Sequence, residues 1–166
     1  GLCSTVCNHN VIDIKLNDDG FFQPFINNQS ACVNCGLCAK VCSFVNDLEE
    51  SNPIMCYAAW SKDKDVVSSS TSGGVSYEVA KTLISKGFTS CGVCYNAKPE
   101  SAEHFVCNEL VSLEQSKGSK YLQSYTVDAL LLLNRKEKNV VVGTPCQIAS
   151  FRRYIELFRC SDNFIL

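Results

Sequence analysis

The chain has 166 residues, with 15 Lys and Arg against 17 Asp and Glu, so its formal net charge is −2. An apolar fraction of 46% is enough for a folded core and too high for a disordered chain. The near-neutral charge lacks the basic character of nucleic-acid-binding proteins, so we expect no nucleic-acid partner. Apolar runs such as that at 129–133 are far shorter than the roughly 20 residues of a membrane span. No secretion signal opens the chain, and we expect a cytoplasmic protein.

Cysteine is the residue type that departs most from ordinary composition. The chain has 12 cysteines, and six of them fall between Cys3 and Cys42. Disulfide-stabilised secreted domains are shorter, whereas clustered thiols in a reducing compartment usually bind metal. We therefore expect metal-bound thiolates in the first part of the chain.

Four of these cysteines are regularly spaced, as C-x2-C-x2-C-x3-C over Cys32, Cys35, Cys38 and Cys42. This is the spacing of bacterial ferredoxins, in which three thiolates bind one 4Fe–4S cluster and the fourth binds the neighbouring cluster. Buried apolar cysteines would not produce this regularity. Gly36 suits a loop whose backbone passes close to inorganic sulfide.

The first seven residues repeat part of this pattern. Gly-Leu-Cys-x-x-Val-Cys occurs at 1–7 and again at 36–42. Cys3 and Cys7 then correspond to the third and fourth cysteines of a first motif, and we expect its two earlier cysteines upstream. Under the crossover rule, the second cluster binds Cys3 and Cys42, and the first cluster is complete within the chain, on Cys7, Cys32, Cys35 and Cys38.

The residues around these cysteines predict a small α+β ferredoxin-like module. Alternating residues predict strands over 11–16 and 21–26, joined by a turn at 18–20. Glu49–Pro53 is polar and ends in proline, as linkers often do. We therefore expect a 4Fe–4S ferredoxin-type domain over residues 1–52, with its first motif truncated, and a second domain over residues 54–166.

The second part alternates between strand and helix patterns, which predicts an incomplete α/β domain. The expected strands are 55–60, 88–95, 103–108 and 139–143, and the expected helices are 75–85, 125–134 and one that starts at 144–146. In the first of these helices we expect a buried face formed by Val75, Val79, Leu83 and Ile84. The apolar end at 164–166 has no evident partner, so we expect more sheet to follow.

The remaining cysteines and histidines lack metal-site patterns. Cys91 and Cys94 lie in an expected strand, where residues three apart point to opposite faces, and no second pair follows at zinc spacing. We interpret them as buried structural cysteines, and give Cys56, Cys107 and Cys160 the same interpretation. His9 and His104 are expected to be surface or strand residues.

Three turns with small residues precede helices or carry a cation. Ser70–Gly74 offers hydroxyls and free amides at a helix start, either as an anion site or as an ordinary N-cap. The turn at 118–121 adds Lys120 and an aromatic ring. Cys146 follows a buried strand in the first turn of a helix, where it is either a reactive thiol or a packing residue.

These segments together carry a family resemblance. The ferredoxin repeat is followed in order by Thr71-Ser72-Gly73-Gly74-Val75, by residues 118–124, by Gly143-Thr144-Pro145-Cys146-Gln147-Ile148-Ala149 and by Arg152-Arg153-Tyr154. This order resembles the coenzyme F(420) hydrogenase/dehydrogenase beta-subunit family, here with a fused dicluster ferredoxin module. The resemblance implies that FAD joins iron–sulfur electron transfer to a two-electron acceptor, which is the deazaflavin F(420) in archaeal members. Members of the family extend beyond this C-terminus, so part of the flavin site is expected there.

The resemblance also implies site residues. Candidate flavin-binding residues are Ser72, Gly73, Gly74, Ser119, Lys120 and Tyr121, and Cys146 is a candidate catalytic residue. The expected function is that of an iron–sulfur flavoprotein oxidoreductase that passes electrons between 4Fe–4S clusters and a flavin or deazaflavin-type acceptor. Its expected partner is a redox protein or a small-molecule electron acceptor. Two alternatives stay open, a non-enzymatic ferredoxin-type carrier or docking subunit and a zinc-binding interaction module.

Overall fold

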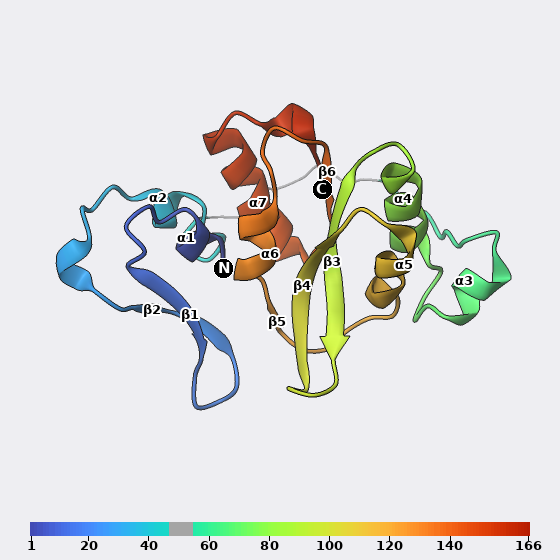
Figure 1. Cartoon of the computed structure of the whole chain (residues 1–166), viewed down its shortest axis with the longest axis horizontal. Helices are drawn as coiled ribbons and strands as arrows, with labels where there is room; N and C mark the ends of the chain where they lie inside the picture. Colours follow the sequence, from blue (N-terminus) through green and yellow to red (C-terminus); the bar gives the residue numbers. More distant parts are fainter. Residues whose placement is uncertain (47–54) are drawn as a thin grey trace.

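The computed structural model describes residues 1–46 and 55–166 (Figure 1). The predicted linker Glu49–Pro53 and the predicted domain boundary lie outside the described residues. Within the described part, a two-stranded sheet lies in the Cys-rich segment and a five-stranded sheet in the second part. None of the described helices is both long enough and apolar enough to cross a membrane.

The Cys-rich segment, residues 1–46, is built around a β-hairpin. Its elements are α1 (Leu2–Thr5), β1 (Ile12–Leu16), β2 (Phe22–Ile26), the 3-10 helix η1 (Gln29–Ala31) and α2 (Leu37–Lys40). The two strands pair antiparallel, with Ile12 opposite Ile26 and Leu16 opposite Phe22. Gly20 closes the hairpin at a φ of 81°, a left-handed conformation that glycine adopts without a Cβ clash. The predicted hairpin is confirmed.

The second part is a mixed α/β domain, in agreement with the coarse prediction. Its sheet has the order β5-β4-β3-β6-β7, with β3 (Thr89–Asn96), β4 (Ser101–Cys107), β5 (Ser124–Tyr125), β6 (Asn139–Val141) and β7 (Phe164–Ile165). β3 and β4 are antiparallel because only a short turn joins them, whereas β3–β6, β4–β5 and β6–β7 are parallel. The expectation that the C-terminal run has no partner is wrong, since β7 pairs with β6.

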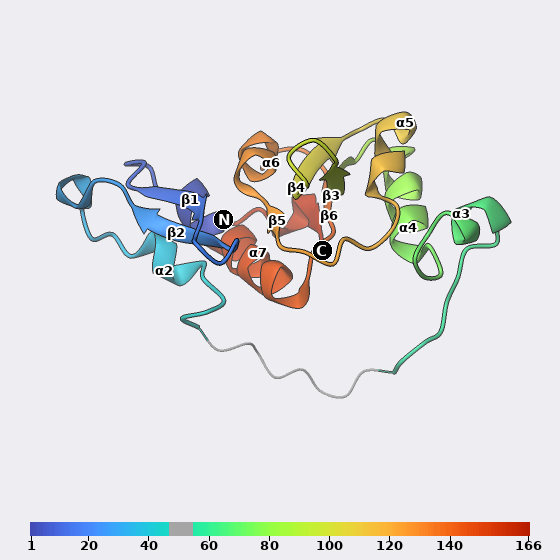
Figure 2. The same cartoon turned by 90° about the horizontal axis from the view of Figure 1, so that it is seen from below.

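Helices cover both sides of this sheet. They are α3 (Lys64–Ser68), α4 (Val75–Ile84), α5 (Leu110–Leu113), α6 (Val127–Leu132) and α7 (Pro145–Leu157), with 3-10 turns η2 (Glu114–Ser116) and η3 (Ser161–Asn163). Figures 1 and 2 show α4 and α5 on one side of the sheet and α6 and α7 on the other. α7 starts where predicted because Thr144 and Gln147 form a reciprocal capping box, with Pro145 in the first turn.

The predicted buried face of α4 is only partly right. α4 buries Ile84 as predicted, together with Tyr77 and Ala80, whereas Val75 and Val79 are 42% and 44% exposed. The apolar spacing was compatible with either face, and packing against α5 and the sheet selected the one with Tyr77.

The predicted strand over 55–60 does not form. Met55, Tyr57 and Trp60 are exposed, and so is Cys56, which we had expected to be buried. The residues that follow approach the α4 turn, where the Ser61 N–H donates to the Gly73 carbonyl at 2.7 Å. An apolar run becomes a strand only beside another strand, and no described strand pairs with this one.

The Cys-rich segment and the α/β domain share one hydrophobic core. Leu2, Val6 and Val41 belong to the same buried cluster as Leu130 and Phe151 of α6 and α7. The Phe22 ring also packs against the Tyr125 ring, with centroids 5.2 Å apart. The hairpin is therefore packed directly on the domain that follows it.

Candidate functional site

The six clustered cysteines lie on the short helices α1 and α2 and on the loops beside them. Cys32 and Cys35 are exposed in the loop before α2, whereas the other four are half-buried, and none forms a disulfide. Gly36 has a φ of 73° at the N-terminus of α2, and Asn34 has a φ of 52°. These left-handed residues turn the loop sharply between its cysteines.

Over residues 1–46 and 55–166, no three His, Cys, Asp or Glu side chains are grouped closely enough to hold a single metal ion. A 4Fe–4S cluster makes a different demand, because each of its four thiolates binds a different iron atom. The donor set matches that demand, since soft thiols are the ligands that iron–sulfur clusters take. Residues 32–36 are in neither helix nor strand, and the two cysteines of this loop, Cys32 and Cys35, are exposed.

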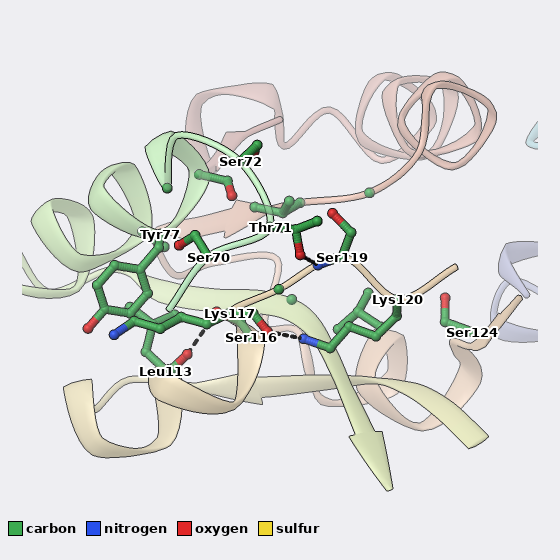
Figure 3. Close-up of a pocket in the computed structure, with 18 of the residues that line it drawn as sticks. Ser70, Thr71, Ser72, Tyr77, Leu113, Ser116, Lys117, Ser119, Lys120 and Ser124 are labelled. Atoms are coloured by element: carbon green, nitrogen blue, oxygen red, sulfur yellow. Dashed lines mark hydrogen bonds between the residues drawn. The ribbon is translucent and has the colours of Figure 1, made fainter. Parts of the chain in front are cut away.

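A pocket rich in hydroxyl groups, here the hydroxyl pocket, lies beside the sheet on the α4 side (Figure 3). Its volume is about 310 Å³. Its walls include the turn and helix start of α4, strand β3, η2 with the loop after it, and the turn between β6 and α7. The polar lining includes Ser70, Thr71, Ser72, Ser76, Ser90, Ser116, Lys117, Ser119, Lys120, Ser124, Thr144 and Gln147.

Two of these segments are joined across the pocket. The Ser119 N–H donates to Thr71 Oγ1 at 2.7 Å (Figure 3). Gly74 has a φ of 73°, and a Cβ there would lie 2.7 Å from Val66 Cγ1. A Cβ on Gly73 would lie 2.3 Å from the Ala59 carbonyl oxygen. The two glycines are therefore required for the turn that presents these hydroxyls.

The pocket's two lysines already have partners. Lys120 Nζ donates to the carbonyls of Gln115 and Lys117, at 3.0 and 2.8 Å, and burial lowers the pKa of Lys120. Lys117 pairs with Glu114 at 2.6 Å and lies over the Tyr77 ring. The Tyr77 hydroxyl donates to the same Glu114 carboxylate. Burial, and to a smaller extent this hydrogen bond, raises the pKa of Tyr77 to about 12. The lysines thus fix the loop and leave positive charge at the pocket wall.

A second cavity, the interface cavity, lies between the Cys-rich segment and the α/β domain. It has a volume of about 300 Å³ and is mainly apolar. Cys3, Cys42 and Cys146 line it, together with His104. Five residues line both cavities, so the two spaces adjoin: Leu122, Ser124, Gly143, Thr144 and Gln147.

Burial governs the titration of two groups in the interface cavity. It raises the pKa of the Cys3 thiol, and it lowers the pKa of His104 to about 4, so the imidazole is neutral near pH 7. His104 is 8% exposed, and its Nδ1 has no hydrogen-bond partner among the described residues. Cys146 is exposed, and its sulfur lies 3.3 Å from Thr144 Oγ1.

The structure brings together only some of the residues that sequence analysis selected. Ser72, Gly74, Ser119 and Lys120 line the hydroxyl pocket. Gly73 packs instead against residues 59–60, Tyr121 is 87% exposed, and Cys146 faces the interface cavity. The Gly74 turn follows the helix α3.

Part of the hydroxyl lining was missed. Ser70 and Thr71 belong to the turn that the sequence marked as a possible anion site, whereas Ser76, two residues beyond Gly74, was not selected. Ser90 and Ser116 come from separate elements that no local pattern connects. Elsewhere Cys91, Cys107 and Cys160 are buried as predicted, whereas Cys94 is half-buried in β3.

Comparison with protein families defines the class in two steps. Residues 1–45 match the model of the 4Fe-4S dicluster domain. Residues 56–131 match the model of the coenzyme F420 hydrogenase/dehydrogenase beta subunit N-terminal domain. The resemblance inferred from sequence is confirmed. No curated protein matches the chain. The two families identify an electron-transfer oxidoreductase subunit.

Proposed function

We propose that the chain passes electrons between 4Fe–4S clusters and a flavin or deazaflavin bound at the hydroxyl pocket. The observation that carries the proposal is the adjacency of two chemically different cavities. One has cysteine thiols on its wall, the other has hydroxyls and amides, and they share the turn from Gly143 to Gln147. One-electron clusters beside a two-electron cofactor are the arrangement that such a transfer requires.

The ligands of the first cluster are proposed to be Cys7, Cys32, Cys35 and Cys38, with Cys3 and Cys42 at the second. When bound, the clusters supply one-electron transfer. The role of the chain is to hold them beside the α/β domain, which the shared core around Leu2 and Val41 supports. The exposed loop with Cys32 and Cys35 faces outward and suits a redox partner protein.

The hydroxyl pocket is proposed to bind the phosphate-bearing part of the cofactor. The pocket volume of about 310 Å³ is at the small end of the range for ligand pockets, roughly 300–1,000 Å³. The pocket therefore suits one part of a flavin nucleotide. Serine and threonine hydroxyls, free amides at the start of α4 and the charge of Lys120 all favour an anion.

The test measures flavin binding by the anaerobically reconstituted chain, with the quenching of FAD fluorescence as the readout. Lys120→Ala should raise the dissociation constant roughly tenfold, the effect of losing one charge-assisted contact, while iron content stays unchanged. Lys136→Ala, on the exposed turn before β6, is the matched control. Equal FAD affinity in both variants and the wild type would refute the pocket assignment. Absence of any flavin binding alongside intact clusters would favour a simple electron carrier.

A further inference from the structure

The interface cavity adjoins the hydroxyl pocket but differs from it in chemistry. Its apolar lining comes from both parts of the chain, with Phe22 and Pro24 on β2 and with Ile148 and Phe151 on α7. Water gains little in such a space, because apolar walls offer it few hydrogen-bond partners. The apolar part of a ligand gains free energy there, since burial removes its surface from water. The cavity therefore suits an apolar group.

Polar side chains lie where the two cavities meet. Ser124 and Gln147 line both cavities, and Gln147 Nε2 donates to Ser124 Oγ at 3.4 Å. A hydrogen bond of this length is weak, so both groups are able to bind a ligand instead. Gln147 Oε1 accepts the Thr144 N–H at 2.8 Å, which keeps the amide at this position. A ligand that extends from one cavity into the other therefore meets a hydroxyl and an amide at the junction.

Packing fixes the β2 wall of the interface cavity relative to the α7 wall. Ser150 Oγ on α7 accepts the N–H of Ser43 in the Cys-rich segment at 3.0 Å. The Phe22 ring packs against Tyr125, and the side-chain amide of Gln123 hydrogen-bonds the Phe22 backbone. The cavity is therefore already formed in the folded chain, and the hairpin is one of its walls.

We propose that the interface cavity binds the flat ring system of the flavin or deazaflavin. The inference rests on the proposed function, which places the phosphate-bearing part of the same cofactor in the adjoining hydroxyl pocket. The ring system has apolar faces and a polar edge, which match the apolar lining of the cavity and the polar groups of Ser124 and Gln147. The ring then shares its cavity with Cys3 and Cys42, the ligands proposed for the second cluster.

The test uses two fragments of the cofactor as probes of the whole, anaerobically reconstituted chain. Lumiflavin has the ring system without the phosphate-bearing chain, and pyrophosphate has no ring. Cys146→Phe fills part of the interface cavity alone, so it should weaken lumiflavin binding roughly tenfold and leave pyrophosphate binding unchanged. Lys120→Ala should weaken pyrophosphate binding and leave lumiflavin binding unchanged. Leu132→Phe, an exposed position that lines neither cavity, is the matched control.

A second measurement does not depend on a variant. Lumiflavin should slow hydrogen exchange in β2 of the wild-type chain, because the ring contacts the hairpin wall, whereas pyrophosphate should leave this exchange unaltered.

Isothermal titration calorimetry gives both affinities, and far-UV circular dichroism establishes that each variant is folded. Wild-type lumiflavin affinity in Cys146→Phe would overturn the inference, and so would weaker lumiflavin binding in Lys120→Ala. Absence of lumiflavin binding to the wild type, or unaltered exchange in β2 with lumiflavin bound, would also overturn it. Wild-type pyrophosphate affinity in Lys120→Ala would instead refute the anion site of the proposed function. The two failures are therefore distinguishable.

Discussion

The side-chain amide of Gln123 hydrogen-bonds both backbone groups of Phe22. Its Nε2 donates to the Phe22 carbonyl at 3.0 Å, and its Oε1 accepts the Phe22 N–H. The amide thus pairs with both backbone hydrogen-bonding groups of Phe22, as a neighbouring strand would. It also connects the hairpin to the loop that lies between the two cavities.

Replacing Gln123 by Glu should loosen this attachment. A carboxylate still accepts the Phe22 N–H but repels the carbonyl oxygen, and the lost bond is worth about 1 kcal/mol. We expect faster hydrogen exchange across β2, measured by mass spectrometry of the whole chain. Gln23→Glu makes the same change on an exposed residue of that strand and should leave exchange unaltered. Identical exchange in both variants would contradict the role given to Gln123.

Gly74→Ala should destabilise the chain by more than its backbone conformation alone explains. Alanine at a φ of 73° costs about 1 kcal/mol, and its Cβ would also overlap Val66 Cγ1. Gly20→Ala is the matched control, because Gly20 has a φ of 81° with open space around it. Urea unfolding should show a larger loss for Gly74→Ala. Equal losses would mean that the contact with α3 relaxes without cost.

Val41→Ala should destabilise the whole chain. Val41 is fully buried in the core shared with α6 and α7, and removal of two methyl groups there costs about 2 kcal/mol. Val33→Ala, at an exposed position of the cysteine loop, should cost less than about 0.5 kcal/mol. The readout is one cooperative unfolding transition that shifts as a unit. If only the hairpin signal shifted, the two parts would unfold independently.

Stability should fall on acidification because of His104. Its pKa is about 4 in the folded chain and 6.5 when unfolded, mainly through burial. Above pH 6.5 the neutral imidazole contributes its full stability to the folded chain. As the pH falls below 6.5 the unfolded chain takes up a proton before the folded chain does, so this stability is lost progressively and is gone below about pH 4. The difference corresponds to at most about 3 kcal/mol.

The measurement is urea unfolding at several pH values with a chelator present, so that acid release of the clusters does not contribute. His104→Gln removes the titrating group and should flatten the profile between pH 6.5 and about 4 relative to the wild type. Parallel profiles for the two proteins would show that His104 is not the group responsible.

Sequence by itself determined the features that depend on local spacing. The cysteine repeat predicted an iron–sulfur module, since ligand spacing in one loop is set by the chain itself. Alternation and turn residues predicted the β1–β2 hairpin, and the Thr144-Pro145 start predicted the beginning of α7. The order of the motifs carried the family resemblance that the two family matches confirm.

Tertiary structure decided what depends on contacts between distant segments. The period of α4 allowed two buried faces, and only packing selected Tyr77 over Val79. The apolar run at 55–60 lacked a strand to pair with, which no local pattern reveals. Cys146 was predicted as a candidate catalytic residue from its place in a helix start, and the contact of Ser150 with Ser43 places that helix beside the cysteines of the first segment. A helix start fixes where a thiol occurs along the chain, whereas the cavity it faces depends on which surface the helix packs against.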